Sequence, residues 1–174
     1  MRRLLDTLYL TAGGIAAFAI LLICLLVTAQ VGLNVLARIG GPAWSYTIPS
    51  YADFAGYFLS TASFMAFAYT LRQGGHIRVN LFVGRMSARI RWKLEMMTLA
   101  VAGAASAFAF CYGTKLMLES LHYGDKSTGM IAVPIWIPQC AMVAGLALLT
   151  LAFFDTLVQS LRAGQSVIVD QEEA

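Results

Sequence analysis

The chain has few charged residues, and this shortage indicates its class. Only 12% of its 174 residues are Asp, Glu, Lys or Arg, whereas 59% are hydrophobic. Soluble domains carry about 25% charged residues. A soluble fold of this composition would lack the polar side chains needed to cover its surface. The composition therefore predicts an integral membrane protein of one domain, and the modest net charge of +3 does not indicate a nucleic-acid partner.

Cysteine is also scarce. The three cysteines, Cys24, Cys111 and Cys140, lie far apart in apolar runs and form no CxxC motif. Zinc and iron sites need clustered ligands, so this spacing argues against a metal or redox site. We interpret the cysteines as small core residues. P-loop, GxSxG and HExxH motifs are missing as well, so we predict no enzymatic activity and no catalytic, cofactor-binding or metal-binding residue.

What the sequence does contain is long apolar runs. No charged residue interrupts the segment from Thr7 to Ala37. A helix needs about 20 apolar residues to cross the hydrocarbon of a membrane, so this run is long enough. A cleaved signal peptide is the alternative, but its apolar core would be only about 7–15 residues long. We therefore predict a retained transmembrane helix.

Three further apolar runs complete an all-α integral membrane protein with four transmembrane helices. Gly40, Gly41 and Pro42 end the first helix, since neither residue type continues a helix well. The last residues of the chain are polar. We predict a four-helix membrane domain over residues 1–162 and a polar cytoplasmic tail over 163–174, with spans at about 8–37, 51–71, 95–117 and 134–156.

The segment from Arg72 to Lys93 carries half of the twelve Lys and Arg residues and no acid. Apolar side chains recur within it at helical spacing, and the arginines mostly fall off that stripe. The pattern favours an amphipathic helix in the membrane interface between the second and third spans, with the arginines towards lipid phosphates or a partner. A solvated loop that only sets orientation is the alternative. The stripe consists of Val79, Phe82, Val83, Met86 and Ile90.

Charge distribution predicts the orientation in the membrane. The N-terminus, the basic segment and the tail hold nine of the twelve Lys and Arg residues. The positive-inside rule therefore places both termini in the cytoplasm and the loops 39–50 and 119–133 outside. His76 and His122, the two histidines, then lie on opposite sides of the membrane. They cannot ligate one haem together, which weakens a cytochrome-like interpretation.

Polar side chains near the ends of the spans are candidate contacts to a partner or to lipid. Gln30, Asn34 and Arg38 are spaced i, i+4, i+8 and share one helix face. Polar groups in hydrocarbon are costly, so this face either packs against protein or lies partly at the headgroups. Asp53 falls in the first turn of the second span. Its carboxylate either stabilises the helix by interacting with the positive end of the helix dipole or pairs with Arg38, and both alternatives stay open.

The loop between the third and fourth spans contains Asp125 and Lys126, and the following PIWIP segment places Trp136 at the membrane interface. Small residues in the third span form two small-xxx-small pairs, which let helix backbones approach closely. We expect tight packing on this face, and the fourth span has small residues as well. The pairs are Gly103 with Ala107 and Ala100 with Ala104, and the small residues of the fourth span are Ala141 and Gly145.

The predicted spans lack an ionisable residue near their centres. Intramembrane charges mark the ion paths of transporters, so their absence argues against a transporter that works alone. A multidrug-type exporter would need an acid deep in the first span, where Asp6 lies only at the edge. The profile favours an accessory or scaffold subunit of a larger membrane complex. The alternative is a small membrane anchor, or a cytochrome- or quinone-type subunit, of a respiratory enzyme complex.

One ordered set of motifs resembles a known family. Residues 72–81 read RQGGHIRVNL and are similar to the R-x-G-x-H-I-R-V-D-L run that joins the second and third helices in the small, DctQ-like membrane subunit of TRAP (tripartite ATP-independent periplasmic) transporters. Asn34–Arg38, Asp53, the run GDKSTG at 124–129 and Ile135–Pro138 resemble further parts of that family in order and spacing. The resemblance covers about residues 30–140. Asn80 and Gly56 depart from the pattern, as does the Tyr51–Asp53 segment.

The resemblance implies a function. Such transporters reside in the bacterial inner membrane and import organic acids with a sodium gradient. The small subunit pairs with a separate large membrane subunit, which carries substrate and ions, and a periplasmic binding protein delivers the substrate. Under this interpretation the basic segment contacts phospholipids and the outer loops contact the binding protein. The candidate partner or lipid contacts are Gln30, Asn34, Arg38, Asp53, His76, Arg78, Arg85, Arg89, Asp125, Lys126 and Trp136.

Overall fold

The structure is a computed structural model that describes residues 2–72 and 87–164. These residues form four long helices, and each is long and apolar enough to cross a membrane, as predicted. Between them lie one short 3-10 helix and two connections, and the described residues contain no strand beyond an isolated β-bridge. The elements, in chain order, are α1 (Arg2–Gly40), η1 (Pro42–Trp44), α2 (Tyr51–Arg72), α4 (Ala88–Tyr123) and α5 (Trp136–Ala163).

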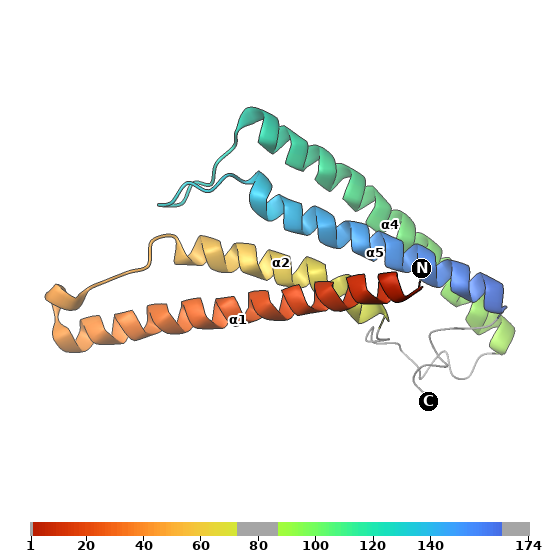
Figure 1. The fold of residues 1–174 in the computed structure, drawn as a ribbon, viewed down its shortest axis with the longest axis horizontal. Helices are drawn as coiled ribbons and strands as arrows, with labels where there is room; N and C mark the ends of the chain where they lie inside the picture. Colours follow the sequence, from red (N-terminus) through yellow and green to blue (C-terminus); the bar gives the residue numbers. More distant parts are fainter. Residues whose placement is uncertain (1, 73–86, 165–174) are drawn as a thin grey trace.

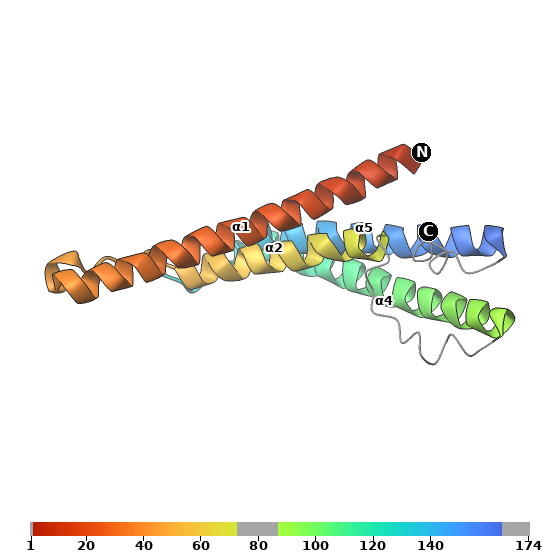
Figure 2. The same ribbon diagram turned by 90° about the horizontal axis from the view of Figure 1, so that it is seen from below.

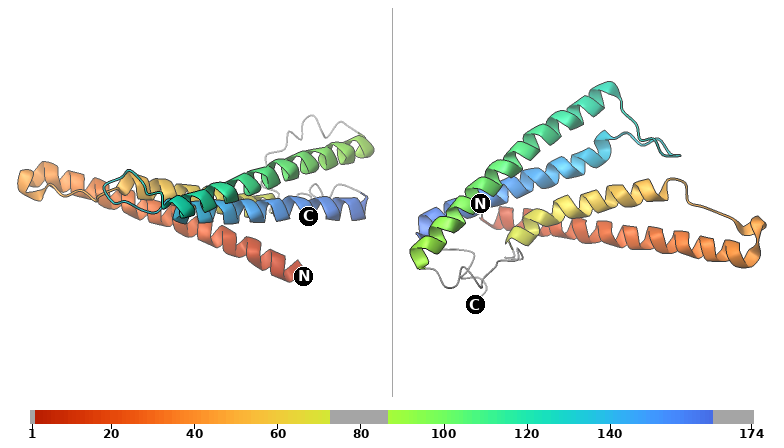
Figure 3. Two further views of the ribbon diagram at one scale, coloured as in Figure 1. Left: turned by 90° about the horizontal axis from the view of Figure 1, so that it is seen from above. Right: turned by 180° about the vertical axis from the view of Figure 1, so that it is seen from behind.

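The helices pack in the order α1, α2, α5, α4, so that α2 and α5 form the centre (Figure 1). Figures 2 and 3 show α1 and α4 on opposite sides of this central pair. The ends that carry Asp6, Arg72, Arg89 and Arg162 lie together at one end of the bundle. This end is called the basic end below. The α1–α2 and α4–α5 hairpins diverge towards the other end, the loop end.

The first hairpin turns where the sequence predicts. α1 ends at Gly40, and Gly41 follows with a φ of +74°, which a side chain would disfavour. Ala12 and Ala16 of α1 are buried against Met65 of α2. Small side chains on α1 thus let the two helices approach closely along their length.

The second hairpin differs from the prediction at both ends of α4. This helix begins at Ala88, so Arg89, Ile90 and Arg91 belong to the third spanning helix and not to a separate interfacial helix. The remainder of the expected amphipathic helix lies outside the described residues. At its other end α4 continues through residues 119–123, whereas the sequence predicts a loop over 119–133, and Gly124 caps the helix with a φ of +68°.

Close packing between α2 and α5 depends on one glycine. A Cβ atom built on Gly145 would lie 2.5 Å from the carbonyl oxygen of Phe64. Gly103 of α4 faces α5, where its Cβ would make an ordinary contact of 3.5 Å with Cβ of Phe153. The face with Gly103 therefore packs as predicted, whereas Ala100 and Ala104 are exposed.

The interpretation of the cysteines as core residues is wrong for this chain. Cys24, Cys111 and Cys140 are all exposed on the outer surface of the bundle. A bundle of four helices has little interior, so most apolar side chains face outwards. There they contact lipid or another membrane protein. The described residues contain no group of three or more His, Cys, Asp or Glu side chains placed to hold a metal ion.

Candidate functional site: polar clusters at the two ends of the bundle

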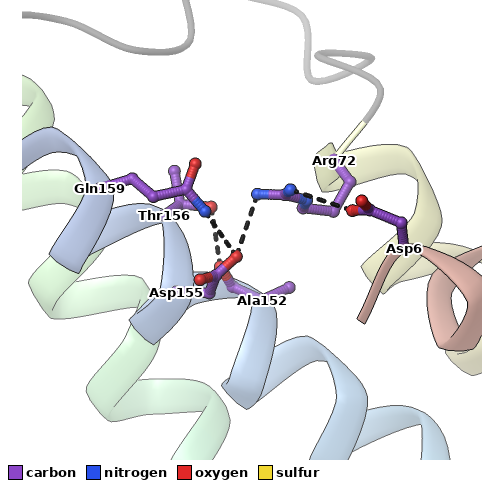
Figure 4. Close-up of polar contacts among 6 residues, drawn as sticks. All are labelled: Asp6, Arg72, Ala152, Asp155, Thr156 and Gln159. Atoms are coloured by element: carbon purple, nitrogen blue, oxygen red, sulfur yellow. Dashed lines mark hydrogen bonds and ion pairs between the residues drawn. The ribbon is translucent and has the colours of Figure 1, made fainter. Parts of the chain in front are cut away.

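A network of charges joins three helices at the basic end (Figure 4). Arg72, the last residue of α2, lies 3.1 Å from a carboxylate oxygen of Asp155 in α5. Its other terminal nitrogen lies 3.4 Å from Asp6 in α1. The Arg72 and Asp155 side chains are 19% and 24% exposed, whereas the Asp6 side chain is 54% exposed. The pair with Asp155 is thus better shielded from water, which strengthens it relative to the pair with Asp6.

Further contacts fix both members of the stronger pair. The side-chain amide of Gln159 donates a 2.6 Å hydrogen bond to Asp155, from the next turn of α5. The guanidinium of Arg72 also lies over the buried ring of Tyr9, 5.5 Å from its centroid, in a cation–π contact. Tyr9 packs in one cluster with Leu71 and Ala152. The charges of this network therefore pair with one another within the chain. The network holds α1, α2 and α5 together.

Neither this network nor its role was predicted, although the sequence contained a signal for it. Three apolar runs are bounded by a charged residue at this end: Asp6 precedes the first run, and Arg72 and Asp155 follow the second and the fourth. An up-and-down topology brings these three residues to the same side of the membrane. One cation between two acids on the same side predicts an ion pair. The choice of partner depends on packing, because Arg89, Arg91 and Arg162 also belong to helix ends at the basic end.

At the loop end, Gln30 anchors the connection between α1 and α2. Its side chain is 4% exposed. Its carbonyl oxygen accepts a 2.9 Å hydrogen bond from the backbone N–H of Ile48, and its amide donates to Asn34. The predicted polar face therefore packs against protein at Gln30, whereas Asn34 and Arg38 are exposed. No ion pair joins Arg38 to Asp53 in the part of the chain that the structure describes.

Asp53 instead lies beside the second loop. It occupies the first turn of α2, as predicted, and a Cβ atom on Gly129 would overlap its carboxylate. The backbone N–H of Ile131 donates a 2.9 Å hydrogen bond to the hydroxyl of Ser50, which has a φ of +56°. The start of α2 and the loop between α4 and α5 thus contact each other. Sequence reasoning missed this contact, since no local pattern links positions so far apart.

The loop between α4 and α5 is also held by its own backbone. The N–H of Ile135 donates to the carbonyl of Asp125, and Lys126 forms the β-bridge with Pro134. The side chains of Asp125 and Lys126 are exposed, while Trp136 begins α5 and is half-buried. The loop therefore presents an acid and a base on an ordered backbone.

The remaining predicted contacts lie around the connection from α2 to α4. Arg89 is exposed in the first turn of α4. Whether the other three contact lipid or a partner stays a prediction, because they lie outside the described residues. They are His76, Arg78 and Arg85.

Large apolar side chains are exposed on all four helices, among them Phe18, Leu59, Phe108 and Leu151. Exposed apolar surface along helices of this length defines a polytopic α-helical membrane protein whose outer surface faces lipid or other membrane subunits.

Residues 23–163 match the family described as tripartite ATP-independent periplasmic transporters, DctQ component. The chain belongs to this family, the small membrane component of TRAP transporters of the bacterial inner membrane. The match includes α1 from residue 23 onwards and all of α2, α4 and α5. No curated protein and no solved structure gives a significant match to the chain. The resemblance seen in the sequence is thus confirmed, and the family is a transporter component, which gives no support to the alternative of a respiratory subunit.

Proposed function

We propose that this chain is the scaffold subunit of a sodium-driven transporter that imports an organic acid. It pairs with a large membrane subunit, which carries substrate and ions, and a periplasmic binding protein supplies the substrate. The family match over residues 23–163 is the observation that carries this proposal.

The distribution of charge supports a scaffold. α1 has no charged residue between Asp6 and Arg38, and α2 has none between Asp53 and Arg72. Arg72 and Asp155, two partly buried charges, neutralise each other within the chain. Substrate and ion sites within a membrane need accessible polar groups near its middle. In this proposal those groups belong to the large subunit.

Co-purification tests the pairing. The chain is expressed with an affinity tag from its natural operon in bacterial membranes and is purified in mild detergent. We expect a large polytopic subunit to co-purify in a fixed ratio. We also expect reconstituted vesicles to accumulate an organic acid only with a sodium gradient, the binding protein and both membrane subunits present. A stable chain that recovers no large subunit, or uptake that is unchanged without this chain, would overturn the proposal.

The orientation and the lipid contacts are part of the same proposal. Both termini and the basic segment face the cytoplasm, where Arg78, Arg85 and Arg89 contact anionic phospholipids. Charge reversal at Arg78 and Arg85 should lower the yield of assembled complex and the uptake rate. Unchanged assembly and uptake would contradict the lipid contact.

The binding protein contacts the loop that presents Asp125 and Lys126. These side chains are exposed on a backbone held by the bonds described above, which preorganises them for a partner. Changing both residues to alanine should raise the concentration of binding protein needed for half-maximal uptake. Identical uptake curves for the variant and the natural sequence would contradict this contact.

A further inference from the structure

The loop end of α1 extends beyond its neighbour α2. Ala12 and Ala16 of α1 pack against Met65, and a Cβ on Gly13 would touch the ring of Tyr69. In this antiparallel register, Tyr51 at the start of α2 lies level with about residue 28 of α1, because both helices rise about 1.5 Å per residue. The last turns of α1 therefore project beyond α2 (Figure 1). At the helical rise per residue, the projection is about 18 Å long.

This projection passes the edge of the hydrocarbon. The 22 residues of α2 span about 33 Å, which matches a hydrocarbon core of about 30 Å. Asp53 and Arg72 lie at the two ends of α2 and place those ends at the polar boundaries. A tilt large enough to bury all 39 residues of α1 would leave α2 too short to cross.

The projecting segment is nevertheless apolar. We name residues 31–46, from the last turns of α1 through η1, the α1 tip. Ile39 is 82% exposed, and Val35 and Leu36 are exposed on the same side of the helix. Trp44 and Tyr46 extend this apolar surface into the connection.

The end of α4 provides a contrast at the same end of the bundle. It ends about level with the start of α2, and its exposed leucines there, Leu118 and Leu121, alternate with the exposed polar side chains of Lys115, Glu119 and His122. These polar side chains suit contact with water. The α1 tip has only Arg38 as a charged group, and no ion pair engages this side chain within the described residues.

We propose that the α1 tip is a docking surface for the large membrane subunit, outside the hydrocarbon. An apolar surface in water needs a permanent cover, and interfaces of permanent complexes are more hydrophobic than those of transient ones. A soluble binding protein that binds only transiently would need a more polar contact surface. Arg38 selects a surface with a carboxylate beside the apolar patch. This inference rests on the proposed function, since it names where the proposed partner binds.

Site-specific photo-cross-linking in native membranes tests the location. A photo-cross-linking amino acid replaces Ile39 in one variant and Leu121, an exposed residue at the end of α4, in the control. The large subunit and the binding protein are co-expressed with each variant. We expect the large subunit to be the main protein cross-linked at Ile39, with a yield several times that at Leu121. A main product with the binding protein, or lipid adducts alone, would overturn the inference.

A charge substitution gives an independent measurement. Ile39→Glu places a carboxylate in the proposed contact, and Leu121→Glu is the matched control. Since central interface residues dominate affinity, we expect Ile39→Glu to lower the co-purified large subunit about tenfold at an unchanged amount of inserted chain. Equal recovery from both variants would overturn the inference alone. Failure of the natural sequence to recover any large subunit would overturn the proposed function together with it.

Discussion

Arg72 and Asp155 form an ion pair of 3.1 Å that joins the end of α2 to α5 and so connects the two hairpins of the bundle. Asp6 of α1 reaches the same guanidinium from the other side, at 3.4 Å. The hairpins diverge towards the loop end, and this contact joins them at the opposite, basic end. The Arg72 side chain thereby links three transmembrane helices, α1, α2 and α5.

Removal of either member of this pair should destabilise the bundle. Arg72→Met and Asp155→Asn each leave a partly shielded charge without its main partner, and we expect a loss of about 1–3 kcal/mol in the free energy of unfolding. The double variant should lose less than the sum, with a coupling energy of about 1–3 kcal/mol. Unfolding by SDS titration of the purified protein in detergent measures these values.

Asp6→Asn should lower stability less than either of these changes, since the Asp6 side chain is 54% exposed. Strictly additive effects of Arg72→Met and Asp155→Asn would refute the pairing.

The ring of Tyr9, and not its hydroxyl, should support Arg72. The hydroxyl is buried and makes no hydrogen bond within the described residues, whereas the guanidinium lies over the ring. Tyr9→Phe should therefore preserve or slightly raise stability, because it removes a buried unsatisfied group and keeps the cation–π contact. Tyr9→Leu should lower stability by about 0.5–2 kcal/mol. The same SDS titration separates the two. A larger loss for Tyr9→Phe than for Tyr9→Leu would show that the hydroxyl has a partner.

Gly145 should not tolerate even a methyl group. Its Cβ would lie 2.5 Å from the Phe64 carbonyl oxygen, and a backbone atom can move away only if α2 and α5 separate. We expect Gly145→Ala to cost about 1–3 kcal/mol. Gly56→Ala is the control, because its Cβ meets open space and alanine favours a helix by about 1 kcal/mol. Thermal unfolding of both variants in the same detergent compares them. A Gly145→Ala variant as stable as Gly56→Ala would contradict the close approach of the two helices.

The contact between the two loops should depend on the hydroxyl of Ser50. Ser50→Ala removes the acceptor for the N–H of Ile131, so this amide should exchange with deuterium about two- to tenfold faster. Ser45→Ala provides the control, since Ser45 is exposed in the same connection. Hydrogen–deuterium exchange read by mass spectrometry on the peptide containing Ile131 measures the effect. Equal exchange in both variants would mean that the bond does not hold the loop.

Much of the architecture follows from local pattern. Runs without charge predict the four spans, and the Gly40–Pro42 break predicts the end of α1, because both depend on the chemistry of neighbouring residues. The extension of α4 to Tyr123 was missed, since polar residues in a helix beyond the membrane resemble a loop in hydropathy alone. The placement of the cysteines in a core was wrong, because apolar surroundings in a membrane protein do not imply burial within the chain.

The sequence by itself determined the class, the number of spans and the family, since hydropathy and short motifs are local properties. Tertiary structure alone decided that Arg72 pairs with Asp155 and Asp6, that Gly145 faces Phe64, and that Ser50 meets Ile131. These contacts join residues of different helices, and helix order and rotation select each partner. The register of α1 on α2 likewise decided that α1 extends beyond its neighbour, because the relative height of two helices is set by the side chains that pack between them.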